Sequence, residues 1–373
     1  MKITAIEAIP ISYPEPNDNG AMRMTVLVRV STDEGLVGWG EAIAMWPEAC
    51  AAVKALIENG LSALIIGTDP LDVEAQWHRM REHCWWYGRG GIASFSIAAI
   101  DIALWDLKGQ ALGVPLYRLL GGRIHASLPA IASIHVTKGT PEENSEAIAN
   151  YMADGFAGVK MGMGKRGLAG LGVDPARDVA YVKAAREAVG RDALMMMDAG
   201  NGVRWSPAQA IRMTRLFEPY ALDWIEEPLH PDDVEGHRLL HSSVATRIAT
   251  GEREWTTEGH RRLIDSDTVD VVRIDPGRAE GITGFLRVAA LAALSRRKVN
   301  AHAWSTTVIS AASLHLSVAS VAAEVFEFKP LPGPSQFELV ETPLLPQGGR
   351  AVPSEGPGLG IKVIGASVRR WSA

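Results

Sequence analysis

Five titratable side chains in the middle of the chain each close a short apolar run of the kind that forms a buried parallel strand. They are four carboxylates and one imidazole, Asp198, Glu226, Glu252, Asp275 and His302. Their successive separations of 28, 26, 23 and 27 positions each leave room for one loop, one helix and the next strand. The carboxyl ends of parallel barrel strands share one face, so we expect these five groups to converge on one mouth.

The first three of these residues have the chemistry of a metal site. Crowded carboxylates raise one another's pKa and oppose folding, and a divalent cation removes that repulsion. Ligation by oxygen alone favours a hard cation, so Asp198, Glu226 and Glu252 are predicted to bind Mg²⁺, with Mn²⁺ as the alternative. One such acid alone is more often a helix N-cap or a surface group, but three in succession favour the metal. A bound cation would neutralise the enediolate that forms when a carbon beside a carboxylate loses its proton.

Asp275 and His302, at the ends of the next two predicted strands, are suited to proton transfer. A carboxylate beside one imidazole nitrogen orients the ring and raises its basicity. A single histidine in a strand is more often structural, but the place of His302 in the series favours a general base or acid that faces the metal.

The rest of the chain must position these groups. Strand candidates alternate with helices over residues 126–325, which predicts a (β/α) barrel and an α/β fold class. Residues 1–125 read instead as an α+β unit, with a hairpin over 25–41 and helices over 47–60, 72–83 and 92–112. Residues 326–373 are rich in Pro and Gly, and we expect them to pack back on the first domain.

The composition is that of a globular enzyme and argues against polyanionic partners. The 373 residues are 47% hydrophobic and 21% charged, and the formal net charge of −6 leaves no basic field for nucleic acid or an anionic membrane. Cys50 and Cys84 lie far apart in no metal-like spacing, which favours a reducing compartment. No signal peptide or comfortable membrane span is found, so we expect a cytoplasmic protein.

Longer motifs accompany the five groups. They are AAIDIALWDLKG at 98–109, LLGG at 119–122, WIEEP at 224–228, GE at 251–252 and GITG at 281–284. With these motifs the chain resembles the enolase superfamily over almost its whole length, in the subgroup of mandelate racemase and muconate lactonizing enzyme, and it is similar there to acid-sugar dehydratases.

This resemblance implies a modified (β/α)7β TIM-type barrel under an N-terminal α+β capping domain that the C-terminal segment completes. It also implies an essential Mg²⁺ and proton abstraction next to a carboxylate, for which this superfamily uses a Lys or His base. Asp198, Glu226 and Glu252 match the metal ligands, and Asp275 with His302 matches the catalytic dyad. Members are often symmetric, so a homo-oligomer is expected.

The chain departs from the pattern of its relatives at the second barrel strand. Relatives commonly carry Lys-x-Lys there, with the second lysine as a base on the face opposite the histidine, whereas this chain has Lys160, Met161 and Gly162. Lys160 can still supply positive charge to the reaction. A second base is missing unless Lys165 or Arg166 folds in from the glycine-rich loop, which disfavours a two-base racemase.

A single His-Asp dyad with Mg²⁺ suits the loss of water from an acid sugar. His302 would take the C2 proton of a 2-hydroxy acid, and the departing 3-hydroxyl would be protonated by the same ring or a nearby acid, to give a 2-keto-3-deoxy acid. The partner is thus a small carboxylate sugar, and candidate substrate-binding residues at the mouth are Arg253, His135, Arg204, Arg23, Trp304 and Lys165. The resemblance adds Glu327, with Glu324 as the competing choice, as an acid that hydrogen-bonds the substrate carboxylate or its enediolate.

Some of these assignments have alternatives. Arg253 could bind a second carboxylate or hydroxyl of the substrate, or pair with Glu226 or Glu227. Arg23 follows a Pro- and Asn-rich segment, 14–20, which is expected to close as a lid. An isomerase acting on an acid sugar or a sugar lactone is the second functional hypothesis, and a ligand-binding relative without catalysis is the third; retention of the dyad counts against the latter.

Overall fold

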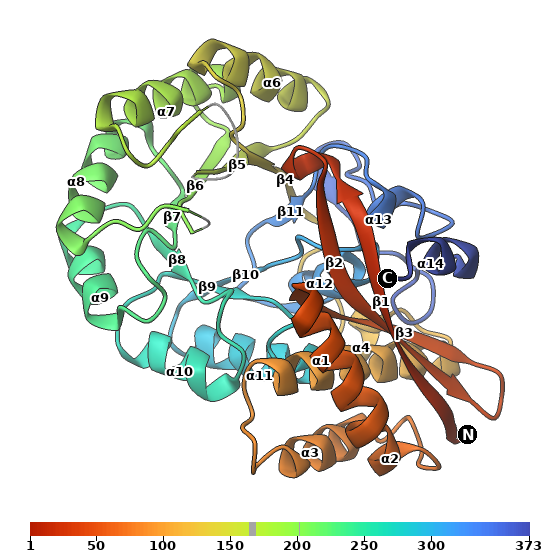
Figure 1. Ribbon diagram of the computed structural model, residues 1–373. Helices are drawn as coiled ribbons and strands as arrows, with labels where there is room; N and C mark the ends of the chain where they lie inside the picture. Colours follow the sequence, from red (N-terminus) through yellow and green to blue (C-terminus); the bar gives the residue numbers. More distant parts are fainter. Residues whose placement is uncertain (164–168, 201) are drawn as a thin grey trace.

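The computed structural model describes residues 1–163, 169–200 and 202–373. The chain begins with an antiparallel sheet in the order β1-β2-β3, formed by Ile3–Glu15, Ala21–Thr32 and Val37–Met45. β1 pairs with β2 along almost its whole length. This sheet stands beside the barrel (Figure 1).

Helices cover one side of the sheet and complete the capping unit. α4 (Ile92–Leu112) agrees with the helix predicted over 92–112, and it is almost entirely buried because its residues are apolar around the whole circumference. The helix predicted over 47–60 is α1 up to Leu56 and then continues as one π-helical turn, where Ser62 donates to the Ile57 carbonyl at 2.7 Å. The other helices are α2 (Ser62–Ile65), α3 (Val73–His83) and α5 (Leu116–Leu119).

Parallel strands then form a barrel in chain order. Neighbouring strands are hydrogen-bonded from β10 back through β4, and β11 pairs with β4 on its other side. A bridge between Val299 and Ala323 brings the last two strand regions together. The strands are β4 (Leu128–His135), β5 (Gly158–Gly162), β6 (Leu194–Asp198), β7 (Trp224–Glu226), β8 (Ile248–Thr250), β9 (Val271–Ile274), β10 (Lys298–Ala301) and β11 (Phe326–Phe328). This arrangement confirms the modified TIM-type barrel with its capping domain.

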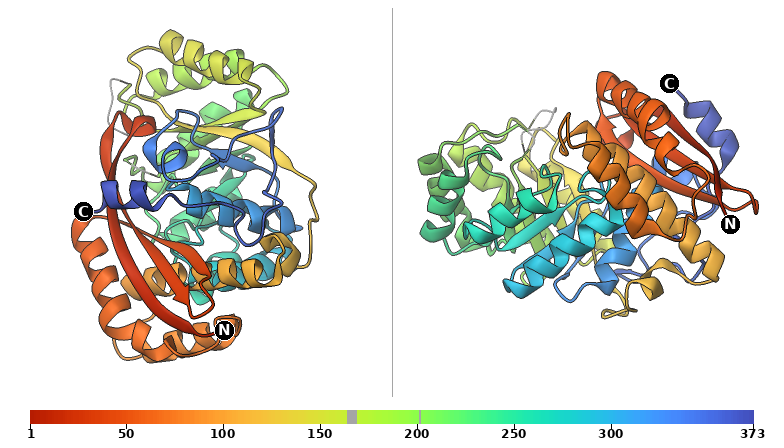
Figure 2. Two further views of the ribbon diagram at one scale, coloured as in Figure 1. Left: turned by 90° about the vertical axis from the view of Figure 1, so that its right-hand side faces the viewer. Right: turned by 90° about the horizontal axis from the view of Figure 1, so that it is seen from below.

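Each crossover between barrel strands contains a helix on the outside (Figures 1 and 2). Several of these helices begin at local signals: Thr140 and Ser206 form capping boxes with Glu143 and Gln209, and proline follows both caps. The helices are α6 (Pro141–Ala153), α7 (Pro175–Val189), α8 (Pro207–Phe217), α9 (Val234–Ser243), α10 (Thr257–Asp265), α11 (Gly281–Leu294) and α12 (Thr307–Ala319).

The C-terminal segment runs back along the capping sheet. Its short elements are α13 (Pro334–Phe337), β12 (Arg350–Ala351) and α14 (Gly365–Trp371). The amide of Ala373 donates to the Pro10 carbonyl at 3.0 Å, and Figure 2 shows α14 against β1. β11 begins at Phe326, one residue past the predicted end of the barrel at 325, because three residues are too few to show a strand period. In the described part of the chain, no helix has the length and apolar character needed to cross a membrane.

Two buried carboxylates hold the capping unit against the barrel. Glu41 on β3 accepts hydrogen bonds from the hydroxyls of Ser305 and Thr306, both at 2.5 Å. These two residues lie in the loop that follows β10. Asp101 on α4 accepts from the hydroxyl of Thr283 at 2.6 Å and from its amide at 2.9 Å. These contacts set the cap over the carboxyl ends of the last barrel strands.

Candidate active site

Strand register brings four sequence-distant positions side by side at the mouth of the barrel. His135 pairs with Gly162, Gly162 with Asp198, and Asp198 with Glu226. Since parallel strands in register present corresponding residues at the same height, the ends of β4 to β7 form one continuous edge. The predicted convergence of the strand ends is therefore observed.

Asp198, Glu226 and Glu252 form a compact acidic cluster at this edge. One carboxylate oxygen of each lies within 4.8 Å of the others, and all three residues are at most 9% exposed. Oε2 of Glu252 is buried and accepts no hydrogen bond from the described residues. A carboxylate oxygen in that state calls for a cation or a proton.

Two cations and a fourth carboxylate lie directly behind the cluster. Nζ of Lys160 is 3.0 Å from Glu226, 2.9 Å from Glu327 and 3.4 Å from Asp198. Arg273, which is fully buried, contacts Glu226 at 2.9 Å and Glu327 at 2.5 Å. Four carboxylates against two cations leave a formal charge of −2 in the barrel, which matches the charge of one divalent cation.

The pKa values of the buried carboxylates shift in opposite directions. Burial raises the pKa of Glu226 well above its usual value, and Asp198 and Glu252 raise it further against the opposing effect of Arg273 and Lys160. Burial also opposes ionisation of Glu327, but Arg273 and Lys160 outweigh it and lower its pKa to about 2. The donor set of oxygen atoms and its uncompensated negative charge fit Mg²⁺, which Asp198, Glu226 and Glu252 would hold.

His302 and Asp275 form the predicted dyad. Nδ1 of His302 lies 2.6 Å from Oδ2 of Asp275, whose other oxygen accepts from the Gly277 amide at 2.8 Å. Asp275 is fully buried, whereas the His302 side chain keeps 19% of its surface exposed. Nε2 of His302 lies 3.6 Å from Glu252 and so faces the acidic cluster. The dyad can therefore present one orientated imidazole nitrogen to a molecule bound beside the cluster.

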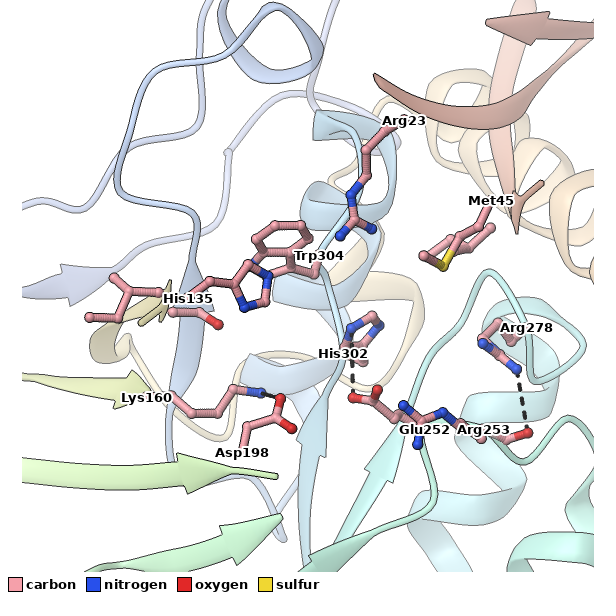
Figure 3. A pocket seen from close by; sticks show the side chains of 13 residues that line it. Arg23, Met45, His135, Lys160, Asp198, Glu252, Arg253, Arg278, His302 and Trp304 are labelled. Carbon is pink, nitrogen blue, oxygen red and sulfur yellow. Dashed lines mark hydrogen bonds and ion pairs between the residues drawn. The ribbon is translucent and has the colours of Figure 1, made fainter. Parts of the chain in front are cut away.

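A pocket joins the cluster, the dyad and the cap (Figure 3). Of the predicted substrate-binding residues, Arg23, His135, Arg253 and Trp304 line it. The ring of Trp304 lies between two of the others, with its centroid 4.6 Å from the His135 ring and 4.4 Å from the Arg23 guanidinium carbon. Figure 3 shows His135 and Lys160 on one side of the pocket, with His302 and Glu252 on the other.

The remaining predicted residues lie elsewhere. Glu327 is behind the cluster with Lys160 and Arg273 and does not line the pocket. Arg204 is exposed and donates to the backbone carbonyls of Gly200 and Val203 at 2.8 and 2.7 Å. Lys165 and Arg166 lie outside the described residues. Substrate contact by Glu327, Arg204 and Lys165 stays a prediction, as does the homo-oligomer.

The structure shows one of the two kinds of partner that were expected for Arg253. Arg253 pairs with Glu227 and also donates to the Gly200 carbonyl at 2.8 Å.

The segment predicted as a lid forms the end of β1 and a 3₁₀ turn, and Glu15 within it binds Lys329 of the C-terminal segment at 2.5 Å. This segment is thus attached at its base to the C-terminal segment.

Arg273 and Arg278 were missed by the sequence reasoning, and Glu227 was considered only as a possible partner of Arg253. Arg273 was assigned only to a strand, although an arginine inside an apolar strand of a barrel is itself a signal of an internal ion pair. Glu227 is buried with a pKa raised to about 7 by burial and by Glu252, and it supports Arg253. Arg278 follows β9 in a loop and lines the pocket; no spacing in the sequence indicates this placement.

Two family descriptions match the chain. Residues 143–367 match the enolase C-terminal domain-like family, and residues 19–121 match the N-terminal domain of mandelate racemase and muconate lactonizing enzyme. Together these ranges include the acidic cluster, the dyad and the capping residues Glu41 and Asp101.

Individual relatives extend over most of the chain. It is 29% identical to D-galactarolactone cycloisomerase of Agrobacterium fabrum, over 97% of each protein. It is 32% identical to L-talarate/galactarate dehydratase of Salmonella typhimurium, over 83% of this chain and 73% of that enzyme. Among solved structures, a racemase from Streptomyces coelicolor with bound magnesium superposes with a TM-score of 0.88 at 26% identity, over 100% of both chains.

The matched families cover both the capping unit and the barrel, and the site contains the acidic cluster and the dyad that the motifs predicted. The chain therefore belongs to the enolase superfamily of enzymes, in its mandelate racemase and muconate lactonizing enzyme subgroup.

Proposed function

We propose that this enzyme is a Mg²⁺-dependent acid-sugar dehydratase, a hydro-lyase that forms a 2-keto-3-deoxy acid. The observation that carries the proposal is the one-sided placement of the base. The orientated imidazole of His302 faces the carboxylate cluster from one side of the pocket, and on the other side the position after Met161 is glycine. One base is sufficient for proton abstraction followed by elimination.

The residues have separate roles in this reaction. Nε2 of His302 takes the proton from C2, while Asp275 holds Nδ1 and stabilises the imidazolium. A divalent cation held by Asp198, Glu226 and Glu252 would stabilise the charge that develops on the substrate carboxylate. The imidazolium then returns its proton to the departing 3-hydroxyl, which leaves as water, and the resulting enol tautomerises to the 2-keto-3-deoxy acid. Arg273 and Glu327 hold Lys160 and Glu226 in place from behind.

Lys160 supports this assignment through its contacts. Its ammonium is held by Glu226 and Glu327 at 3.0 and 2.9 Å, on the side of the cluster away from the dyad. We assign it to positioning the cluster and to balancing negative charge near the substrate carboxylate.

An isomerase is the second candidate, and His135 is the observation that favours it. Its ring lines the same pocket opposite His302. An acid on that face could return a proton to the substrate from the other side, as epimerisation or lactone isomerisation requires. D-galactarolactone cycloisomerase is one of the relatives.

A screen for the product separates these reactions. The Mg²⁺-loaded protein is incubated in D₂O with a library of mono- and diacid sugars, and 2-keto acid is detected chemically while deuterium at C2 is followed by NMR. Keto acid from any member supports elimination. Deuterated, epimerised or ring-altered substrate without keto acid contradicts the dehydratase and favours the isomerase.

A further inference from the structure

Most of the cationic side chains around the pocket already have carboxylate partners. Lys160 is held by the carboxylates of the cluster, and Arg253 pairs with Glu227. Arg23 lies 3.1 Å from Asp18. The positive charge of these three residues is therefore balanced within the protein.

Arg278 differs from them. Among the described residues, no carboxylate oxygen lies within the 4.0 Å limit of an ion pair with its guanidinium; Glu227 interacts with it only at longer range, and its Nε, like that of Arg23, is buried without a hydrogen-bond partner. Its guanidinium contacts are a long hydrogen bond of 3.5 Å from Nη2 to the Arg253 carbonyl and a packing contact 5.2 Å above the Phe95 ring. A guanidinium that lines a pocket and lacks a carboxylate has unused hydrogen-bond donors.

The position of Arg278 relative to the cluster defines what it could bind. Figure 3 shows Arg278 on the His302 side of the pocket with Arg23 and Met45 of the cap, and Lys160 with Asp198 on the other side. A substrate carboxylate at the cluster and C2 beside His302 would leave the remaining carbons to extend toward the cap. The far end of an acid sugar would thus approach Arg278.

We infer that Arg278 binds a second carboxylate at the far end of the substrate, so that the enzyme acts on a diacid sugar. This inference rests on the proposed function for the orientation of the substrate. The barrel cluster balances the charge of a divalent cation, and the unpaired guanidinium balances the second carboxylate. An arginine is suited to this because its planar fork donates two parallel hydrogen bonds to a carboxylate. A neutral hydroxymethyl end would leave the guanidinium without a carboxylate in direct contact.

Matched pairs of substrates test the inference. Each pair differs only in whether C6 is a carboxylate or a hydroxymethyl group: D-glucarate with D-gluconate, galactarate with D-galactonate, and D-mannarate with D-mannonate. For each pair, kcat/KM and the Mg²⁺-dependent thermal shift are measured in the wild type, in Arg278→Lys and in Arg278→Met. Arg261→Met is the control, since Arg261 is 68% exposed on α10.

At least one diacid should be preferred over its monoacid partner by roughly 10-fold or more, and Arg278→Met should reduce that preference to near unity through a KM raised roughly 10- to 100-fold. Arg278→Lys should keep part of it, and Arg261→Met all of it. The inference is wrong if no diacid is bound or turned over better than its partner, or if Arg278→Met affects both members of a pair equally. A preferred diacid that yields no keto acid would contradict the dehydratase while leaving the diacid inference standing.

Discussion

A side chain at position 162 cannot coexist with His135 as it is placed. A Cβ atom added to Gly162 would lie 2.5 Å from Nδ1 of His135 and 3.2 Å from the Ile134 carbonyl. Glycine at position 162 and the histidine of the neighbouring strand therefore form a matched pair.

The first prediction follows from that contact. Gly162→Ala should lower the free energy of unfolding by about 1–3 kcal/mol, because the methyl group forces the His135 ring out of its place. In a His135→Ala background the same change should cost clearly less, since the obstructing ring is gone and only the contact with the Ile134 carbonyl at 3.2 Å remains. Urea unfolding of the four proteins measures the coupling. Gly60→Ala is the control, because its added methyl would meet only Leu56 at 3.4 Å.

An equal loss from Gly162→Ala in both backgrounds would show that His135 is not what requires glycine there.

The second prediction concerns the acidic cluster. Glu252→Gln removes one of three candidate ligands and reduces the formal charge of the barrel group from −2 to −1, so Mg²⁺ affinity measured by calorimetry should fall at least ~10-fold. Burial opposes ionisation of Glu252, but His302, Lys160 and Arg273 outweigh it and hold its pKa well below its usual value, so removal of this charge should also lower the melting temperature in EDTA. Glu187→Gln, at a position 69% exposed, should alter neither quantity.

Unchanged Mg²⁺ affinity in Glu252→Gln would remove this residue from the ligand set.

The third prediction concerns pH and the contact between cap and barrel. Burial raises the pKa of Asp101 to about 7, against the lowering effect of its hydrogen bonds from Thr283. The carboxyl therefore keeps its proton in the folded protein up to about pH 7, whereas the unfolded chain loses it near pH 4. Unfolding releases a proton between these values, so rising pH destabilises the fold there.

Relative to Asp101→Asn, the wild type should lose about 2–4 kcal/mol of stability between pH 4 and 7. Denaturant unfolding of both proteins across this range isolates the contribution of Asp101, because other buried acids are common to both. Asp232→Asn, which replaces an exposed acid, should follow the wild type. Parallel curves for the wild type and Asp101→Asn would mean that Asp101 is ionised in the folded protein.

Much of the barrel could be predicted because its information is local and repeated. Each apolar run ends in a polar group after a nearly constant interval, so Asp198, Glu226 and Glu252 could be placed together before any contact was known. Asp275 and His302 could be placed by the same regular spacing of strand ends. These residues lie at the carboxyl ends of barrel strands, and in this fold all of those ends face the mouth of the barrel.

Residues outside this regular spacing of strand ends were harder to place. Arg278 reaches the pocket from a loop, and its direction depends on the cap that packs above it. Glu327 lies on a strand of three residues, too short for a period, and its inward position depends on pairing with β4. Arg204 follows a strand end closely but turns to backbone carbonyls, because local hydrogen bonds outcompete the pocket.

The central claim is that His302 removes the proton next to the substrate carboxylate. Its most direct test is the rate of C2 deuterium incorporation in D₂O, measured by NMR with the acid sugar that the screen identifies, for the Mg²⁺-loaded wild type and His302→Asn. We expect exchange or turnover at C2 in the wild type and a loss of roughly 10²- to 10⁴-fold in the variant, with Mg²⁺ affinity retained. Exchange at the wild-type rate in a folded, Mg²⁺-bound His302→Asn protein would contradict the assignment of the base.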